Sequence, residues 1–403
     1  MLLSWAVSGV KASAYTAQYA TGQATEWHDG DLAKNEGDAK ALKRFPPRAS
    51  EGAPPPPAEP DADSKMYQTK MYRNMMYQNM KSNTDMETDG QLIDQIVDPA
   101  SPYPTYQELE RRARRRFEIE PEDGSNAEAN PALKNWQILF PEKDYEEFRT
   151  QLQFECLRIR YLSDGLKVVG YIYKPKNTLG RKYPVVIYNR GGNREFAEIS
   201  LSDKLVWYRR LAKQGFVVIA SSYRGNDGGE GKEEFGGADV QDVMALATLA
   251  KALPYADPDN LFMYGVSRGG MMTYEAIKNH VAIRAAAVDS GLVDLESLGR
   301  HRPEMISGVY RELMPDFDQR ASEHYRLRSA TQFADKIDVP LLILHGADDD
   351  RVPAADTLRF AGQLQELGKK YELVIYEGDE HGLLLHQNDS WPRIVQWFNQ
   401  FKK

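Results

Sequence analysis

From about residue 151 onward, short apolar runs alternate with longer amphipathic stretches, and this alternation restricts the possible folds most strongly. Eight runs have the length and composition of strands. They are residues 156–161, 166–173, 184–188, 216–220, 261–266, 285–288, 341–344 and 373–376. The amphipathic stretches include residues 239–252, 354–367 and 392–401. Strands that alternate with helices in this way predict an α/β fold, in which helices cover both faces of one sheet.

The runs also predict how the strands pair. Residues 184–188 are apolar throughout, as expected of a parallel strand that is buried on both faces. The first two runs are instead separated by the turn Ser163-Asp164-Gly165, which is typical of an antiparallel hairpin. We therefore predict an eight-stranded, mostly parallel sheet whose first two strands are antiparallel.

The residues before this region have a different character. Prolines 54–57 stand in a background rich in Gly, Ala, Asp and Glu, and a Met/Tyr-rich repeat of period five follows at residues 65–79. A period of five places no continuous apolar face on a helix or a strand. We therefore predict a largely disordered, low-complexity extension over residues 1–130, with a short helix that starts at the capping box Thr105/Glu108. Residues 131–150 are predicted to form a small helical cap.

Composition excludes several classes of protein. The formal net charge of −8 argues against nucleic acid as the main partner, because phosphate binding requires a basic surface. No apolar run approaches the length of a membrane span, and the single Cys156 excludes an intramolecular disulfide. The start of the chain carries no positive residue before its short apolar stretch, so we expect no signal peptide and a cytoplasmic location.

A G-x-S-x-G motif stands between a predicted strand and a predicted helix, at residues 265–269. In this context the motif is typical of a nucleophile elbow, a tight turn that exposes a serine hydroxyl. The motif makes Ser267 the candidate nucleophile. The turn also directs backbone N–H groups toward the position where an oxyanion would form.

An activated serine needs a base and a carboxylate that orients the base. His381 directly follows the last predicted strand, so its loop lies at the edge of the sheet to which the elbow points. Three aspartates, residues 348–350, follow the preceding strand, and spacing alone does not choose among them. We interpret His345 as a structural residue at the end of a strand and His386 as a less suitable base.

Residues from about 155 to 401 resemble the catalytic domain of the prolyl oligopeptidase family, which has the α/β-hydrolase fold. The resemblance rests on five segments in the same order. They are Ser221-Ser222-Tyr223-Arg224-Gly225, Gly236-Gly237-Ala238-Asp239-Val240-x-Asp242, Gly265-Val266-Ser267-Arg268-Gly269-Gly270, His345-Gly346-x-x-Asp349-x-x-Val352-Pro353 and Asp379-Glu380-His381-Gly382. The resemblance implies that Asp349 is the acid of a triad with Ser267 and His381.

The resemblance also suggests an oxyanion hole. Many members of the family have His-Gly-Gly after the third strand, where this chain has Asn189-Arg190-Gly191-Gly192. The backbone N–H groups of Gly192 and Arg268 are the expected donors. Family peptidases often carry Tyr where Arg268 stands.

About 150 residues precede the domain, too few for the seven-bladed propeller that such peptidases usually carry, so we expect a more open site.

Three functions follow as hypotheses. The resemblance favours a serine peptidase that cleaves short peptides through an acyl-enzyme and needs no cofactor or metal. A carboxylesterase-like hydrolase of small acyl esters uses the same three residues. A binding protein that displays its N-terminal arm on an inert hydrolase fold is the third hypothesis, and an intact Ser-Asp-His set argues against it.

Overall fold

The computed structural model describes residues 89–98, 105–116, 136–137, 140–196, 199–201 and 203–403. Of the predicted extension, residues 1–88 lie outside the described residues. Residues 117–135 also lie outside them. Within the described ranges, no helix is both long enough and apolar enough to cross a lipid bilayer.

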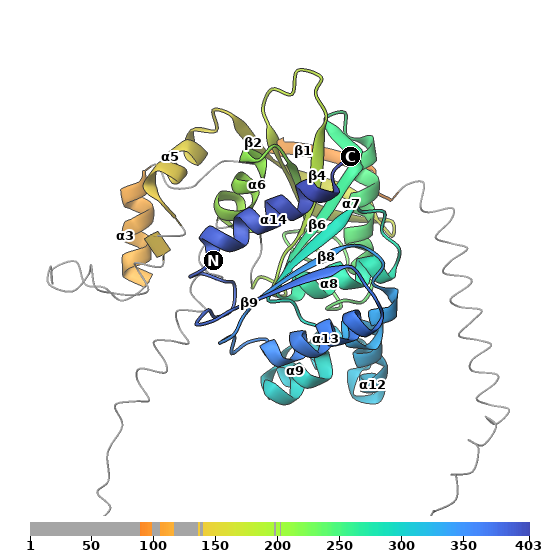
Figure 1. Cartoon of the computed structure of the whole chain (residues 1–403). Coiled ribbons are helices and arrows are strands. Elements are labelled where there is room, and N and C mark those ends of the chain that lie inside the picture. Colours follow the sequence, from red (N-terminus) through yellow and green to blue (C-terminus); the bar gives the residue numbers. More distant parts are fainter. Residues whose placement is uncertain (1–88, 99–104, 117–135, 138–139, 197–198, 202) are drawn as a thin grey trace, which may run out of the picture. The chain divides into compact units, whose positions relative to one another are not determined.

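One twisted sheet runs through the described part of the chain (Figure 1). Its nine strands lie in the order β1-β2-β3-β5-β4-β6-β7-β8-β9. Their bounds are β1 (Leu92–Val97), β2 (Phe154–Ser163), β3 (Leu166–Pro175), β4 (Tyr183–Asn189), β5 (Val217–Ser221), β6 (Ala256–Val266), β7 (Ala285–Asp289), β8 (Leu341–Gly346) and β9 (Tyr371–Tyr376). All neighbouring strands from β5 to β9 pair in parallel. The hairpin β2–β3 is antiparallel, as predicted.

The prediction of eight strands was wrong by one, because β1 lies within the segment that we assigned to the extension. β1 pairs antiparallel with β2, and Asp94 forms an ion pair with Arg160 across the two strands. Its sequence lacks regular alternation, and Ile96 and Val97 remain 61% and 58% exposed. β1 is thus an edge strand held by backbone pairing rather than by a buried face, which leaves no period-two pattern to detect.

Two cores cover the two faces of the sheet, and alternate residues of one strand belong to different cores. In β4, Val185 and Ile187 belong to one core, whereas Val186 and Tyr188 belong to the other. This alternation follows from the period of two along a strand. Because both faces are covered, β4 reads as a continuous apolar run.

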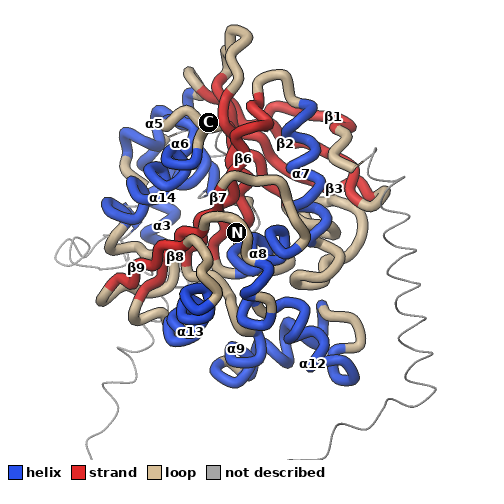
Figure 2. The backbone as a smooth tube through the Cα atoms, turned by 45° about the vertical axis from the view of Figure 1, so that its right-hand side comes forward, coloured by secondary structure: helices blue, strands red, loops and turns tan. Residues whose placement is uncertain are grey.

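Helices pack on both faces (Figure 2). One core includes residues of α7 (Val240–Ala252), α8 (Arg268–Lys278) and α13 (Ala354–Glu366). The other includes residues of α3 (Tyr106–Arg116), α5 (Glu142–Thr150), α6 (Arg209–Lys213) and α14 (Gln387–Phe401). Thr105 caps α3, since its Oγ1 accepts a hydrogen bond from the N–H of Glu108 at 3.2 Å.

A helical insertion stands between β7 and β8. It consists of α9 (Leu295–His301), α10 (Pro303–Met305), a π-helical turn (Ile306–Tyr310), α11 (Arg311–Leu313) and α12 (Phe317–Arg328). Asp294 caps α9, because its Oδ1 accepts from the N–H of Ser297 at 2.9 Å. Leu295, Tyr310 and Phe317 of the insertion belong to the same core as α7 and α8. The insertion is therefore anchored to the domain by apolar packing.

Candidate active site

The turn between β6 and α8 has the strained geometry of a nucleophile elbow at Ser267. This residue has φ 57° and ψ −123°, a combination that non-glycine residues rarely adopt. Its N–H donates to the carbonyl of Asp289 at 2.9 Å, and its carbonyl accepts from the N–H of Gly270 at 2.9 Å. These backbone bonds hold the turn at the carboxyl end of β6.

The two glycines of the motif are required by crowding around this turn. A β-carbon on Gly269 would lie 1.8 Å from the carbonyl oxygen of Asn189 in β4. A β-carbon on Gly265 would lie 2.2 Å from the carbonyl oxygen of Gly269. Since atoms cannot approach so closely, only glycine at both positions lets the elbow pack against the neighbouring strand.

The three aspartates after β8 differ in burial and in what they contact. Asp348 and Asp350 are exposed, whereas Asp349 is buried. Oδ2 of Asp349 lies 2.7 Å from Nδ1 of His381, in the loop after β9. The aspartate that the family resemblance selects is therefore the one that contacts the candidate base.

Several donors keep the Asp349 carboxylate charged. Oδ1 accepts from the N–H groups of Arg351 and Val352, each at 2.9 Å. Burial by itself raises the pKa of this carboxyl, but the charge of His381 and the hydrogen bonds from His345 and His381 outweigh it. The pKa of Asp349 is held well below its usual range. A fixed negative charge therefore lies behind His381.

His345 has a closer relation to the site than the sequence indicated. Its buried ring places Nε2 3.2 Å from Oδ2 of Asp349 and 2.9 Å from the carbonyl of Val352. Nδ1 lies 2.9 Å from Oγ1 of Thr357. We interpreted this histidine as a structural strand-end residue, but it also contacts the candidate acid. The four-residue spacing from His345 to Asp349 is the signal that could have indicated the contact.

His386 contacts the carboxylate of Asp379 and not that of Asp349. Its Nδ1 lies 2.9 Å from Oδ2 of Asp379, its ring stacks on Tyr376, and its side chain is 38% exposed. Asp379 also accepts from the N–H groups of Leu385 and His386, at 3.2 and 3.1 Å. His386 and Asp379 thus shape the loop that carries His381.

Ser267 and His381 line one cavity of about 350 Å³. The loop after β4 and the helical insertion supply much of its wall. Apolar residues of the wall include Phe196, Phe235, Leu292, Leu298, Met305, Val309 and Val352. Charged residues of the wall are Arg194, Arg268, Arg302, Glu304 and Arg351. A cavity of this size falls within the range of small-molecule sites.

The two predicted oxyanion donors both lie on this cavity. Gly192 has φ 64° in the loop after β4, and Arg268 is the first residue of α8. The first N–H groups of a helix have no intrahelical acceptor, so they are available to a ligand. The Arg268 side chain connects the two, because its Nη1 donates to the Gly192 carbonyl at 2.9 Å.

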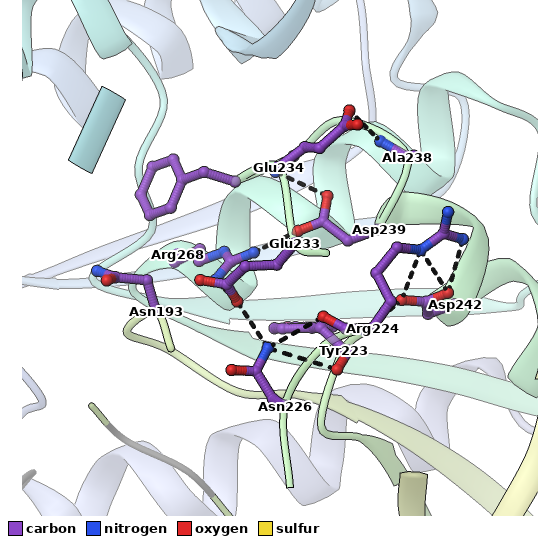
Figure 3. A network of polar contacts seen from close by, with 12 residues as sticks. Asn193, Tyr223, Arg224, Asn226, Glu233, Glu234, Ala238, Asp239, Asp242 and Arg268 are labelled. Carbon is purple, nitrogen blue, oxygen red and sulfur yellow. Dashed lines mark hydrogen bonds and ion pairs between the residues drawn. The ribbon is translucent and has the colours of Figure 1, made fainter. Parts of the chain in front are cut away.

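A buried charge network holds the Arg268 guanidinium (Figure 3). Nη1 donates to Oε2 of Glu233 at 3.0 Å, and Nη2 donates to Oδ2 of Asp239. Glu233 also accepts from Nδ2 of Asn226 at 2.9 Å and from the N–H of Arg194 at 2.7 Å. Sequence reasoning placed Asp239 in a family turn but missed its role and that of Glu233. Their contacts come from folding and leave no local pattern.

A second buried carboxyl, Asp289, lies at the end of β7, next to the elbow. The Ser290 hydroxyl donates to its Oδ1 at 2.8 Å. Burial raises the pKa of Asp289 to about 7, although the hydrogen bond from Ser290 opposes the shift.

Among the described residues, no group of three or more His, Cys, Asp or Glu side chains is arranged to hold a metal ion.

The comparison with protein families agrees with this geometry. Residues 203–403 match the prolyl oligopeptidase family, a range that contains Ser267, Asp349 and His381. The chain is 29% identical over 245 residues to an uncharacterised peptidase of Bacillus subtilis, YtmA, and this match covers 61% of the chain and 92% of that protein.

Longer relatives match over part of their length. Dipeptidyl-peptidase 5 of Porphyromonas gingivalis is 27% identical over 241 residues, which cover 56% of this chain and 34% of that protein. The acylaminoacyl peptidase of Pyrococcus horikoshii has a similar fold, with a TM-score of 0.53 and 23% identity over 64% of this chain and 43% of that one. Residues 203–403 are therefore similar to the prolyl oligopeptidase family, and the relatives that match this part of the chain are named as peptidases.

Proposed function

We propose that this chain is a serine peptidase that cleaves short peptides through an acyl-enzyme formed on Ser267. The observation that carries the proposal is the contact of 2.7 Å between Asp349 Oδ2 and His381 Nδ1, at a cavity that both His381 and Ser267 line. The longer relatives match over about a third of their length, so the activity of the whole protein is part of the proposal.

Each residue has a defined role in the proposed reaction. Asp349 accepts from His381 Nδ1–H, which fixes the tautomer and leaves Nε2 to take the proton of the Ser267 hydroxyl. Ser267 Oγ then attacks the carbonyl carbon of the peptide bond. The imidazolium that forms is stabilised by the Asp349 carboxylate, and it gives its proton to the leaving amine. Water then attacks the acyl carbon while His381 takes its proton. The imidazolium returns this proton to Ser267 Oγ, which leaves, and the acyl group is released as a carboxylic acid.

Backbone N–H groups supply the electrostatic stabilisation of the oxyanion in the proposed reaction. The N–H groups of Arg268 and Gly192 are the proposed donors to the oxyanion. Loss of one such donor costs about 3 kcal/mol in comparable sites. The salt bridges from Arg268 to Glu233 and Asp239 favour this role, because they hold the guanidinium that anchors the Gly192 carbonyl.

Replacement of Ser267 tests the nucleophile. Ser267→Ala should abolish both hydrolysis and covalent labelling by a fluorophosphonate. Ser307→Ala is a matched control, because Ser307 is an exposed serine of the helical insertion and precedes Gly308, which lines the same cavity. Labelling that persists in Ser267→Ala, or is lost in Ser307→Ala, contradicts the assignment.

A pair of substrates separates the peptidase from the carboxylesterase alternative. Purified protein is assayed on peptidyl p-nitroanilides and on p-nitrophenyl acyl esters. Hydrolysis of both, with loss of both in Ser267→Ala, supports the peptidase. Hydrolysis of the esters alone favours the carboxylesterase, which uses the same three residues.

A further inference from the structure

The cavity that contains Ser267 carries an unusual concentration of positive charge for a protein with net charge −8. Four arginines line it, and Glu304 is the carboxylate on its wall. Two of the arginines are paired with carboxylates away from the cavity centre. Arg268 binds Glu233 and Asp239, and Arg194 binds Glu312 at 2.5 Å. Arg302, whose partner Glu304 is largely exposed, and Arg351 line the same cavity.

Arg302 stands at the junction of α9 and α10 in the helical insertion. Its Nε donates to Oε1 of Glu304 at 2.8 Å. Within the described residues, its Nη1 and Nη2 groups donate to no protein atom. The Glu304 side chain is 62% exposed, whereas that of Arg302 is 27% exposed, so water weakens the pair from the glutamate side. The two terminal nitrogens of the Arg302 guanidinium, Nη1 and Nη2, thus remain available to a ligand.

Arg351 reaches the same cavity from the loop of the candidate acid. Its N–H donates to Asp349, and its guanidinium carbon lies 5.8 Å from the ring centre of Phe196. Burial and then the nearby positive charge of Arg302 lower the pKa of the Arg351 guanidinium. Both arginines line the same cavity, so their positive charges act on the same enclosed space. Two cations in a partly desolvated cavity are stabilised when an anion binds between them.

We propose that Arg302 and Arg351 bind a carboxylate of the substrate, so that the enzyme prefers acidic peptides. The inference rests on the proposed peptidase function and names its substrate class. The carboxylate is either an Asp or Glu side chain beside the cleaved bond or the C-terminus of the leaving peptide. Phe196, Met305 and Val309 provide apolar contacts for the carbon chain that carries it. Arginine forks bind carboxylates through paired, charge-assisted hydrogen bonds.

The test compares substrates that differ by one charge. The first arm measures kcat/KM for acetyl-Ala-Glu and acetyl-Ala-Gln p-nitroanilides, and for acetyl-Glu-Ala and acetyl-Gln-Ala p-nitroanilides. The second arm measures cleavage of acetylated tetra-alanine with a free or an amidated C-terminus. We expect the anionic member of at least one pair to be preferred by about 10-fold, because a hydrogen bond to a charged group contributes more than one to a neutral group. Salt should reduce this preference.

Variants of the insertion assign the preference to the cavity. Arg302→Gln should lower the ratio of the two kcat/KM values by about 10-fold, and Arg302→Lys should restore part of it. Glu304→Gln should raise the ratio, because it removes the competing carboxylate. Arg300→Gln is the matched control. Arg300 is an exposed arginine of the same segment, paired with Glu296, and its replacement should leave the ratio unchanged.

The outcomes separate this inference from the proposed function. Equal kcat/KM within every pair, with Ser267 still labelled by a fluorophosphonate, overturns the preference but leaves the peptidase. A preference that survives in Arg302→Gln, with a folded protein by circular dichroism, overturns the assignment to this cavity. Absence of both hydrolysis and labelling in the wild-type protein overturns the peptidase and the preference together.

Discussion

Asp289, the last residue of β7, and Asp349, in the loop after β8, are both buried at the same edge of the sheet, but the two carboxyls differ in charge. Asp349 accepts from two backbone N–H groups and two histidines, and its pKa lies well below the usual range. Asp289 accepts from the neutral hydroxyl of Ser290, and its pKa is raised to about 7. The donors around a carboxylate, and not its burial alone, therefore decide whether it is charged.

The largest expected effect is on catalysis. Asp349→Asn removes the charge behind His381 and favours the wrong ring tautomer, so kcat should fall by about 10⁴-fold. Asp289→Asn is the matched comparison at pH 6, where asparagine resembles the protonated carboxyl already present, and it should lose far less activity. Single-substrate kinetics on a p-nitrophenyl ester measures both. Similar losses of activity in the two variants would remove the distinction between the two aspartates.

The next effect is on stability as a function of pH. The pKa of Asp289 rises from its ordinary value of 3.8 to about 7 in the fold, so the native state binds the proton more tightly. Its contribution to stability is complete below about pH 3.8 and is lost as the pH rises to about 7. Relative to Asp289→Asn, the free energy of unfolding should fall by up to about 1.4 kcal/mol per pH unit in this window.

Urea unfolding of the two proteins between pH 4 and pH 8 measures this difference. The comparison cancels the titration of other buried acids, such as Asp242, whose pKa is raised to about 6 mainly by burial. A difference between wild type and Asp289→Asn that is constant across the range would show that Asp289 is already ionised in the fold.

A smaller effect is expected when one donor to Asp349 is removed. His345→Ala deletes a ring that contacts Asp349, the Val352 carbonyl and the Thr357 hydroxyl. The buried groups left without this partner should destabilise the fold by about 1–3 kcal/mol. The urea midpoint measures the loss, and kcat should fall as well, because Asp349 loses a positioning contact. An unchanged midpoint would contradict the role of His345 in holding this carboxylate.

The smallest effect concerns the donor to Asp289. Ser290→Ala removes the hydroxyl that favours the ionised carboxyl, so the pKa of Asp289 should rise further. The pH at which stability is lost should shift upward, by an amount worth about 1 kcal/mol or less. The same urea series detects the shift, and a downward shift would mean that Ser290 does not donate to Asp289.

The sequence predicted those parts of the fold that repeat a local pattern. The eight predicted runs are strands because each buries both faces or alternates regularly. β1 was missed because its strand character depends on pairing with β2 and not on its own pattern. The helix predicted from Pro392 begins earlier, at Gln387.

The candidate site was predictable where a residue lies in a short motif. Ser267 and His381 follow from the elbow and from the position after the last strand, but Asp349 needed the family resemblance to separate it from its neighbours. The contacts of Glu233 and Asp239 with Arg268 join residues that are 35 and 29 positions apart in the chain. Such contacts depend on the packed loops and have no counterpart in the local sequence.

The side chain of Arg268 ties the elbow to the loop after β4, and this limits how the protein can be engineered. A designer who grafts either loop from another hydrolase would also have to transfer Glu233 and Asp239, since the guanidinium would otherwise be stranded without its counter-ions. The elbow and the loop after β4 therefore form one structural unit, and they have to be exchanged together with these two carboxylates if the engineered hydrolase is to keep its fold.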